Sequence, residues 1–307
     1  MDNKQNARDA RDAPAQHARH QEHSNKMLAA AASAAGNASS SSTPTDELSR
    51  LGTLYGTDKV HHRYTRFYHR LFEHQRHTLG RFLEVGVYRG ASMQMWKEYF
   101  TNAELYGLDS FHNQVEVLRS TPAKGLTRAL RGDLNRGYNF TERVQRGELG
   151  SRVHVIDANQ SEASEMAKVV QSLGIGTMDL IIEDGSHQNR DQQLNLAWLF
   201  PLLRPKSGVY IIEDLTSSFQ GIYDERPRSP HTTFNVMRQF NKTRRMESRH
   251  MSAEERCYLE RWVASAELNV TRRSSKSILC VLRRYESPRP SKVCTTSLPA
   301  QDVDSKV

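Results

Sequence analysis

The chain has 307 residues, of which 37% are hydrophobic and 25% charged, and its net charge is +8. This length fits one large domain with tails or two small domains, and no apolar run is long enough to span a membrane. Three cysteines, Cys257, Cys280 and Cys294, lack the pair spacing of a disulfide framework or a zinc site, so we expect a reducing, cytoplasmic location.

Residues 1–45 contain few large apolar side chains and are rich in Ala, Ser, Asn, Gln and His. Such a segment cannot bury enough surface to offset the entropy lost on ordering, which predicts a disordered tail. Organellar targeting by this tail remains an alternative to a cytoplasmic location. We expect a single domain over 46–286 and a Pro- and Ser-rich flexible tail over 287–307.

From Asp46 onward, apolar strand patterns alternate with amphipathic helical patterns. In chain order the pattern predicts helices at 48–54 and 64–74, a strand at 81–87, a helix at 91–99, strands at 104–109 and 152–157, a helix at 161–173, a strand at 179–184, a helix at 188–200, a strand at 209–214, a helix at 232–242 and strands at 268–272 and 277–283. The stretch 122–150 is left unassigned. This alternation predicts a Rossmann-like, doubly wound α/β fold whose mostly parallel sheet carries an antiparallel edge hairpin.

The positive charge concentrates after Glu225, in stretches such as Thr243-Arg244-Arg245. Such a face can bind nucleic acid, but the basic residues are not interleaved with aromatics as a stacking platform requires. We therefore interpret it as a solvated surface, with neither a nucleic acid nor a membrane as partner.

The first predicted strand of the sheet runs into the turn Gly86-Val87-Tyr88-Arg89-Gly90. Gly86 lets backbone approach a ligand closely, and Gly90 permits tight packing at the start of the next helix. The spacing lacks the Gly-x-Gly-x-x-Gly pattern of dinucleotide sites, so the turn favours a ligand without a pyrophosphate. The alternative is an ordinary strand–helix turn.

The next two strands also end in polar groups. Asp109 lies where a carboxylate can accept both ribose hydroxyls of a nucleoside, although an acid there can also cap a helix. Asp157, Asn159 or Gln160 can each hydrogen-bond an adenine edge, and periodicity does not choose among them. Capping of the following helix by Asn159 or Ser161 is an equal alternative.

Two strands end in the same letters, Ile181-Ile182-Glu183-Asp184 and Ile211-Ile212-Glu213-Asp214. If the strands are neighbours, Asp184, Glu213 and Asp214 converge, and clustered carboxylates repel unless a cation neutralises them. Oxygen ligands without a nearby cysteine favour Mg²⁺. Side chains alternate along a strand, so Glu183 points away from Asp184. The alternative is two loop acids that make caps.

His187 follows Asp184 after Gly185-Ser186, on the same predicted edge of the sheet. An unperturbed histidine has a pKa of about 6.5, which suits a general base at neutral pH. A lone histidine is more often structural, but this one lies beside the predicted metal ligands.

Five short motifs taken in order resemble class I S-adenosylmethionine-dependent methyltransferases, specifically the metal-dependent O-methyltransferases of macrolide and polyketide sugars, of the mycinamicin and tetracenomycin-rhamnose type. The motifs are Tyr55-Gly56-Thr57-Asp58-Lys59, Leu83-Glu84-Val85-Gly86-Val87, Tyr106-Gly107-Leu108-Asp109, Glu183-Asp184-Gly185-Ser186-His187 and Ile212-Glu213-Asp214-Leu215. The resemblance covers roughly residues 51–224. The long N-terminal tail and the basic C-terminal region are not part of it.

The resemblance implies Mg²⁺ bound by Asp184, Glu213 and Asp214, and a catalytic pair of His187 as base and Asp184. It also implies that the Gly56–Lys59 loop closes over the methionine end of S-adenosyl-L-methionine. Together with the strand ends, the cofactor-binding residues expected are Thr57, Asp58, Lys59, Tyr64, Glu84, Gly86, Tyr88, Gly90, Asp109, Asp157, Asn159 and Gln160.

The acceptor implied is a small glycoside or another diol, and its identity lies in variable loops rather than in the motifs. A homo-oligomer is compatible with the sequence. Two other functions stay open: an oxygenase of the cephalosporin-hydroxylase type, which needs an iron centre such as two histidines and a carboxylate, and a non-catalytic nucleoside-binding protein. Only His187 is well placed for the iron centre.

Overall fold

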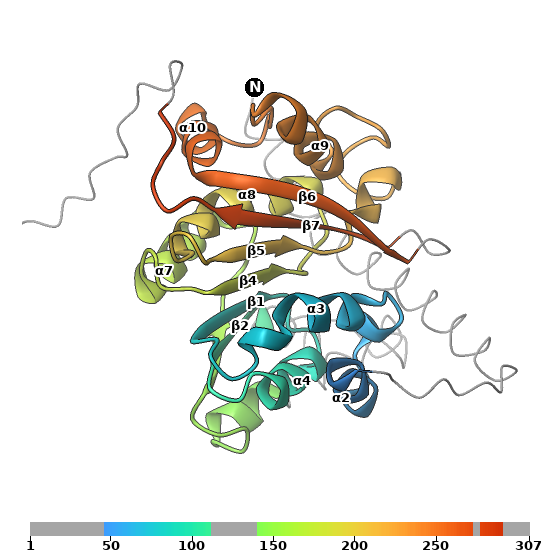
Figure 1. Ribbon diagram of the computed structural model, residues 1–307, viewed down its shortest axis with the longest axis vertical. Coiled ribbons are helices and arrows are strands. Elements are labelled where there is room, and N and C mark those ends of the chain that lie inside the picture. Colours follow the sequence, from blue (N-terminus) through green and yellow to red (C-terminus); the bar gives the residue numbers. More distant parts are fainter. Residues whose placement is uncertain (1–45, 112–139, 273–276, 291–307) are drawn as a thin grey trace, which may run out of the picture.

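The computed structural model describes residues 46–111, 140–272 and 277–290. The segment 1–45, predicted to be disordered, lies outside these ranges, as do residues 291–307 of the predicted C-terminal tail, the turn around Ser274 and much of the unassigned stretch 122–150. The described residues form one seven-stranded sheet with the order β3-β2-β1-β4-β5-β7-β6 (Figure 1).

Strands β1 to β5 are parallel, and β7 runs antiparallel both to β5 and to its other neighbour, β6. The strands are β1 (Arg81–Val85), β2 (Glu104–Asp109), β3 (Val153–Asp157), β4 (Leu180–Glu183), β5 (Val209–Ile212), β6 (Val263–Arg272) and β7 (Ser277–Arg284). The predicted fold class, including the antiparallel hairpin at the edge, is confirmed.

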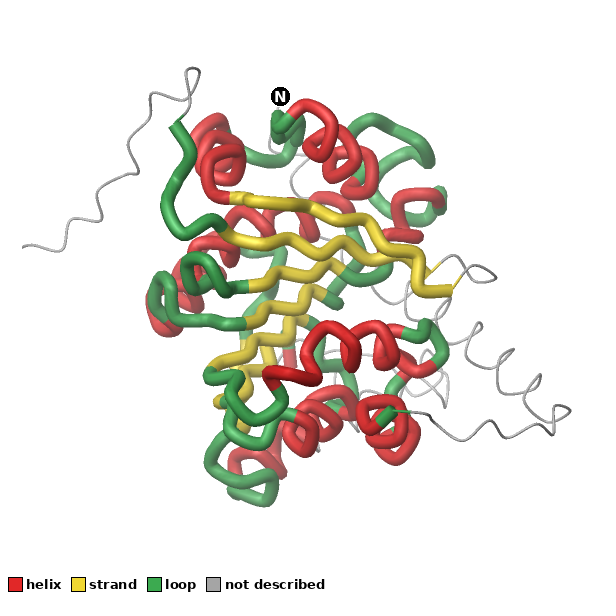
Figure 2. The backbone as a smooth tube through the Cα atoms, viewed as in Figure 1, coloured by secondary structure: helices red, strands yellow, loops and turns green. Residues whose placement is uncertain are grey.

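Helices cover both faces of the sheet (Figure 2). They are α2 (Glu47–Tyr55), α3 (Tyr64–Phe72), α4 (Ala91–Tyr99), α7 (Ala163–Leu173), α8 (Asn189–Leu199), α9 (Thr233–Thr243) and α10 (Ala253–Trp262), with short 3₁₀ helices η2 (Asp58–Val60), η3 (Glu73–Gln75), η4 (Phe200–Leu202) and η5 (Leu215–Phe219). Helices α2, α3 and α4 pack on one face of the sheet, and α7 to α10 pack on the other.

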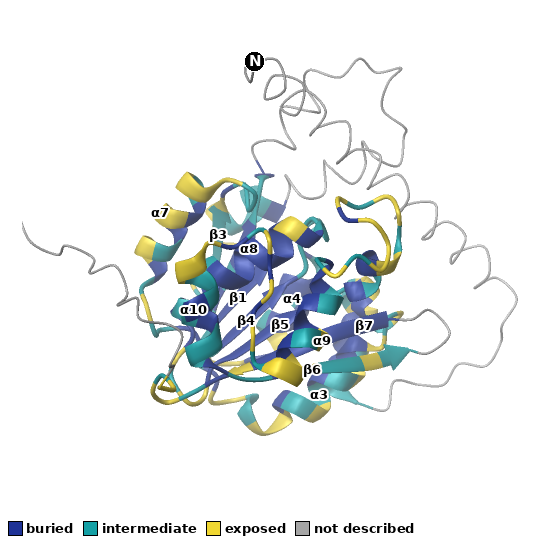
Figure 3. Ribbon diagram, turned by 90° about the horizontal axis from the view of Figure 1, so that it is seen from above, coloured by how far each residue is buried: buried dark blue, intermediate teal, exposed yellow. Residues whose placement is uncertain are grey.

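The central strands are buried on both faces, which explains their unbroken apolar runs. Ile181 belongs to the core under α7 to α10, and its neighbour Ile182 belongs to the core under α2, α3 and α4. Figure 3 shows these strands as a buried layer between partly exposed helices. The alternation fixes which residue after each strand points to which face.

The strand order reverses between β1 and β4, because β2 and β3 continue on one side of β1 and β5 lies beyond β4. Ligands of open α/β sheets bind in the crevice outside the carboxyl ends of the strands at this switch point. Gly86 and Asp184 directly follow β1 and β4, so the predicted site residues lie at this crevice.

Two elements differ from the sequence-based assignment. Helix α10 was not predicted, and β6 starts at Val263 instead of 268. Only Cys257 and Leu259 of α10 are buried, so its apolar stripe is too thin to signal a helix. A signal was present nonetheless, because Ser252 and Glu255 form a capping box at its start.

Cys257 is disulfide-bonded, whereas Cys280 is a buried free thiol. The prediction that the cysteines form no disulfide is therefore wrong for Cys257. Spacing alone could not reveal it, because a disulfide depends on which backbones meet in space. Within the three described ranges, no helix combines the length and the apolar character that a membrane span requires.

Candidate active site at the carboxyl ends of the strands

A buried lysine and three carboxylates meet at the crevice. Lys59 Nζ lies 2.5 Å from Asp184 Oδ2, 2.9 Å from Glu213 Oε1 and 3.4 Å from Glu84 Oε1. Glu84, Asp184 and Glu213 come from β1 and from just beyond β4 and β5, and they share one face because Glu84 pairs in register with Ile182, which pairs with Ile211. The Lys59 side chain is 2% exposed.

One ammonium group cannot neutralise three carboxylates, and the pKa values reflect this. Burial alone would lower the pKa of Lys59, but Asp184, Glu213 and Glu84 outweigh it and raise that pKa well above its usual value. Burial, together with repulsion from Asp184, raises the pKa of Glu213 well above its usual range. Burial also raises the pKa of Asp184, against the pull of Lys59. The cluster therefore favours an additional cation or a retained proton.

Asp214 has a different environment. The Tyr64 hydroxyl donates to Asp214 Oδ1 over 2.8 Å, and His187 Nε2 lies 3.7 Å from Asp214 Oδ2. Burial raises the pKa of Asp214, but His62, His187 and Tyr64 together bring it below its usual value, so this carboxylate stays ionised. His62, whose Nδ1 lies 3.9 Å from Asp214 Oδ1, was missed from the sequence.

Within the described residues, Asp184, His187 and Asp214 form a group that can bind a metal ion. One ligand atom from each lies within 4.8 Å of the others. The two carboxylates are the oxygen donors that Mg²⁺ and Mn²⁺ prefer, so Asp184 and Asp214 fit the ion expected from the sequence. Glu213, the third expected ligand, lies next to this group, but its Oε1 accepts hydrogen bonds from Lys59 (2.9 Å) and from Tyr68 (2.7 Å).

Three strand ends in the crevice carry a residue in the left-handed backbone region. These are Tyr88 after β1, His187 after β4 and Asp214 after β5, with φ values of 53°, 57° and 51°. Residues other than glycine rarely adopt this region, and such strain clusters at functional sites. The backbone turns sharply at each position, and after β4 and β5 the turned residues His187 and Asp214 bring their side chains together.

The glycine turn after β1 is tightly packed. Gly86 has φ +90°, and a Cβ there would lie 2.1 Å from the Asp184 carbonyl oxygen. A Cβ on Gly90, with φ +74°, would collide with the Phe140 ring. Asp109 Oδ2 accepts hydrogen bonds from the amides of Val87 (2.9 Å) and Tyr88 (2.8 Å), so Asp109 also holds this turn in shape.

The remaining expected cofactor residues separate into two sets. Asp157 is exposed, and Asn159 and Gln160 are partly exposed at the crevice, where a Cβ on Gly185 would meet the Gln160 side chain. Asn159 also accepts a hydrogen bond from the Ser161 amide, which is the capping alternative considered above. By contrast, Glu84 is fully buried, and its two oxygens accept hydrogen bonds from Ser92 and Trp96.

The loop before α3 and the first turns of α3 contribute side chains to the site. Asp58 is exposed, and Thr57 is buried with its hydroxyl accepting a hydrogen bond from the Lys59 amide. The Lys59 ammonium donates to the carboxylates of Asp184 and Glu213. The Tyr64 hydroxyl donates to Asp214, and the Tyr68 hydroxyl donates to Glu213. The segment 57–68 therefore contributes one cation and two phenols to the site.

Glu183 does point away from Asp184, as expected from alternation. It is fully buried on the opposite face, where Asn195 of α8 lies 3.5 Å from its Oε1. Burial raises the pKa of Glu183 to about 8. This carboxyl is therefore protonated at neutral pH and takes no part in the metal group.

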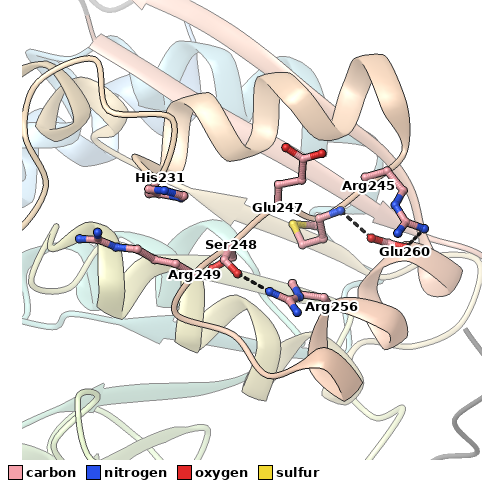
Figure 4. Close-up of a pocket in the computed structure, with 8 residues that line it drawn as sticks. His231, Arg245, Glu247, Ser248, Arg249, Arg256 and Glu260 are labelled. Carbon is pink, nitrogen blue, oxygen red and sulfur yellow. Dashed lines mark hydrogen bonds and ion pairs between the residues drawn. The ribbon is translucent and has the colours of Figure 1, made fainter. Parts of the chain in front are cut away.

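A separate cavity of about 370 Å³ lies between the loop after α9 and helix α10 (Figure 4). Its arginines are largely engaged: Arg245 pairs with Glu260, Arg249 pairs with Glu225, and Arg256 donates to the Ser248 carbonyl. The cavity lies on the α7–α10 side, and none of the predicted site residues lines it.

Comparison with known proteins supports the expected resemblance. Residues 83–215 match a family model described as a methyltransferase domain. The chain is 31% identical over 183 residues to mycinamicin VI 2''-O-methyltransferase of Micromonospora griseorubida, which covers 56% of this chain and 37% of that protein. It is 29% identical over 182 residues to a tetracenomycin-C rhamnosyl 3'-O-methyltransferase of Streptomyces olivaceus. This match covers 56% of this chain and 38% of that protein. The resemblance to O-methyltransferases of macrolide and polyketide sugars is thus confirmed at the level of sequence.

Among solved structures, the chain is similar to MycE methyltransferase in complex with Mg and S-adenosylhomocysteine, with a TM-score of 0.43 and 21% identity over 83% of this chain and 54% of that chain. The chain spans less than two fifths of the length of the two curated relatives above.

Proposed function

Because residues 83–215 match the methyltransferase-domain family, we propose that the chain is an S-adenosylmethionine- and Mg²⁺-dependent O-methyltransferase. Its acceptor is a hydroxyl of a glycoside or another small diol. The observation that carries this proposal is the convergence of Asp184, His187 and Asp214 beside the Gly86 turn, at the switch point of the sheet. A metal group and a ligand-binding turn within one crevice suit a reaction between two bound substrates.

The chain's own residues supply binding, orientation and proton transfer. Asp184 and Asp214, with Glu213 adjacent, would hold a divalent ion, which would supply the Lewis acidity that makes an acceptor hydroxyl more acidic. His187 accepts the hydroxyl proton, and Asp214, 3.7 Å from His187 Nε2, stabilises the resulting imidazolium. Bound S-adenosylmethionine would supply the methyl group: the acceptor oxygen would bond to the methyl carbon as the carbon–sulfur bond breaks, leaving a neutral thioether.

The cofactor-binding residues remain a proposal and differ in their support. Asp157, Asn159 and Gln160 are accessible at the crevice and suit the nucleoside end. Gly86 and Tyr88 belong to the turn that faces the same crevice. The carboxyl of Glu84 is committed to Ser92, Trp96 and Lys59, so we assign Glu84 to supporting Lys59 instead of contacting the cofactor directly.

Two other functions are less well supported. An iron oxygenase site of two histidines and a carboxylate would need His62 beside His187, but His62 Nδ1 bonds Ser277 Oγ over 2.8 Å, and His62 lies outside the metal group. A non-catalytic nucleoside-binding protein would not need the base and the acids that converge here.

The deciding experiment is a methyl-transfer assay with labelled S-adenosylmethionine over a panel of glycosides and catechols, with and without EDTA. We expect transfer to at least one vicinal diol, loss of transfer in EDTA and recovery on adding Mg²⁺. Activity that survives complete metal removal would exclude the metal step. Cofactor binding without transfer to any acceptor would favour the non-catalytic function.

We also infer that the protein works in the cytoplasm, as expected from the spacing of the cysteines, and the buried free thiol of Cys280 is compatible with this location. The Cys257 disulfide is the feature that argues against this location. Fractionation of cells together with thiol counting on the isolated protein tests the inference, and a predominantly secreted, fully oxidised protein would refute it.

A further inference from the structure

Lys59 occupies an unusual position for a residue of a loop expected to cover a cofactor. Its ammonium contacts Asp184 and Glu213, two of the three expected metal ligands, at 2.5 and 2.9 Å. The side chain is almost fully buried, and its ammonium also forms an ion pair with Glu84 Oε1 at 3.4 Å. We propose that Lys59 is a built-in competitor for the divalent ion, and that its fixed positive charge weakens metal binding at this site.

The proposal follows from the shared carboxylates. A divalent ion bound by Asp184 and Asp214, with Glu213 adjacent, must either share Asp184 with the ammonium or displace it. When two cations share a carboxylate they lie about 4–5 Å apart, and their repulsion in a partly buried site corresponds to a factor of about ten or more in affinity. A buried lysine with three carboxylate neighbours cannot escape into water without moving the η2 segment.

The same geometry explains why the acids tolerate burial. Removing one partner of a buried ion pair is strongly destabilising because the other charge is left uncompensated. Lys59 offsets part of the negative charge of Glu84, Asp184 and Glu213 from within the chain, so folding depends less on a metal ion. Lys59 thus weakens metal binding, but it also allows the site to fold before a metal ion is bound.

This inference rests on the proposed metal site, and the test separates the two. Mn²⁺ binding to the metal-depleted full-length protein is measured by calorimetry and by electron paramagnetic resonance for the wild type, Lys59→Met and Lys206→Met. Methionine keeps the length of the side chain without its charge. Lys206 is the control because its side chain is 74% exposed and pairs only loosely with Glu286, at 3.7 Å.

We expect Lys59→Met to bind Mn²⁺ about tenfold or more tightly than the wild type, with Lys206→Met unchanged. We also expect metal to raise the melting temperature more in Lys59→Met than in the wild type, because the variant lacks an internal counter-ion. Equal or weaker binding by Lys59→Met would overturn the role of Lys59 and leave the proposed function intact. Failure of every protein to bind Mn²⁺ would overturn both.

A second measurement covers the case in which Lys59→Met does not fold. In the wild-type protein, a buried, hydrogen-bonded ammonium gives a protected ¹⁵N–¹H resonance that can be followed during a Mg²⁺ titration. We expect the Lys59 resonance to shift or disappear with the same midpoint as metal binding measured by calorimetry. An unchanged resonance at saturating Mg²⁺ would overturn the competition.

Discussion

Gly86 lies directly against the backbone of Asp184, so that a Cβ on Gly86 would stand 2.1 Å from the Asp184 carbonyl oxygen. The glycine turn therefore positions the metal-binding strand end as well as facing the cofactor crevice. The turn expected to bind the cofactor and the strand end expected to bind the metal ion therefore share one backbone contact.

The first prediction tests this contact. Gly86→Ala should destabilise the protein by more than about 3 kcal/mol, since both the left-handed backbone and the collision oppose the methyl group. Gly147→Ala is the matched control, because Gly147 has φ +72° and a Cβ added there would meet no atom within 4 Å; we expect a loss of about 1 kcal/mol there. Urea denaturation measures both, and equal losses would contradict the prediction.

The second prediction concerns the base. His187→Ala should reduce methyl transfer by about 10²- to 10⁴-fold, and Asp184→Asn should abolish it, while S-adenosylmethionine binding measured by calorimetry stays within a few-fold of wild type. His74→Ala, at an exposed histidine, is the control and should be fully active. Unchanged turnover in the His187 and Asp184 double variant would refute the assignment.

The third prediction is a pH dependence of stability. Burial raises the pKa of Glu183 to about 8, so the folded protein disfavours the charged form. Below the unfolded pKa of about 4.3 both states are protonated and no penalty exists. Stability is then lost as pH rises from that value to about 8, because only the unfolded state ionises there.

Glu183→Gln removes this titration and should stabilise the protein at pH 7 by about 3 kcal/mol, with no gain near pH 4. The exposed Glu267→Gln is the control and should give no such trend. Thermal denaturation across this pH range measures the difference. A constant offset between Glu183→Gln and wild type at all pH values would show that Glu183 does not titrate as described.

The fourth prediction compares two tyrosines. The Tyr68 hydroxyl donates to the Glu213 carboxylate over 2.7 Å, whereas the Tyr99 hydroxyl meets the His69 ring over 3.0 Å. Glu213 Oε1 also accepts from the Lys59 ammonium, so the Tyr68 bond belongs to a charged network. A hydrogen bond to a charged group contributes about 1.5–3 kcal/mol and a neutral one about 0.5–1.5. Tyr68→Phe should therefore lower the free energy of unfolding more than Tyr99→Phe does. The reverse order would indicate that Glu213 is protonated and gains little from Tyr68.

The sequence predicted most of the sheet and the acids at its edge because both depend on local rules. Apolar runs identify buried strands, and alternation correctly separates Glu183 from Asp184. The position of Lys59 could not be predicted, since its ammonium meets residues 125 and 154 positions away in the chain. His62 was missed for the same reason: only tertiary packing brings it to Asp214.

The left-handed backbone at Tyr88, His187 and Asp214 has a consequence for how this site can evolve. Each residue holds a conformation that glycine would adopt without strain, so substitution by glycine at His187 or Asp214 removes a functional side chain while relaxing the backbone. Random drift toward greater stability at these positions therefore leads away from activity. Directed evolution for thermostability should leave these three positions fixed and gain stability elsewhere in the chain.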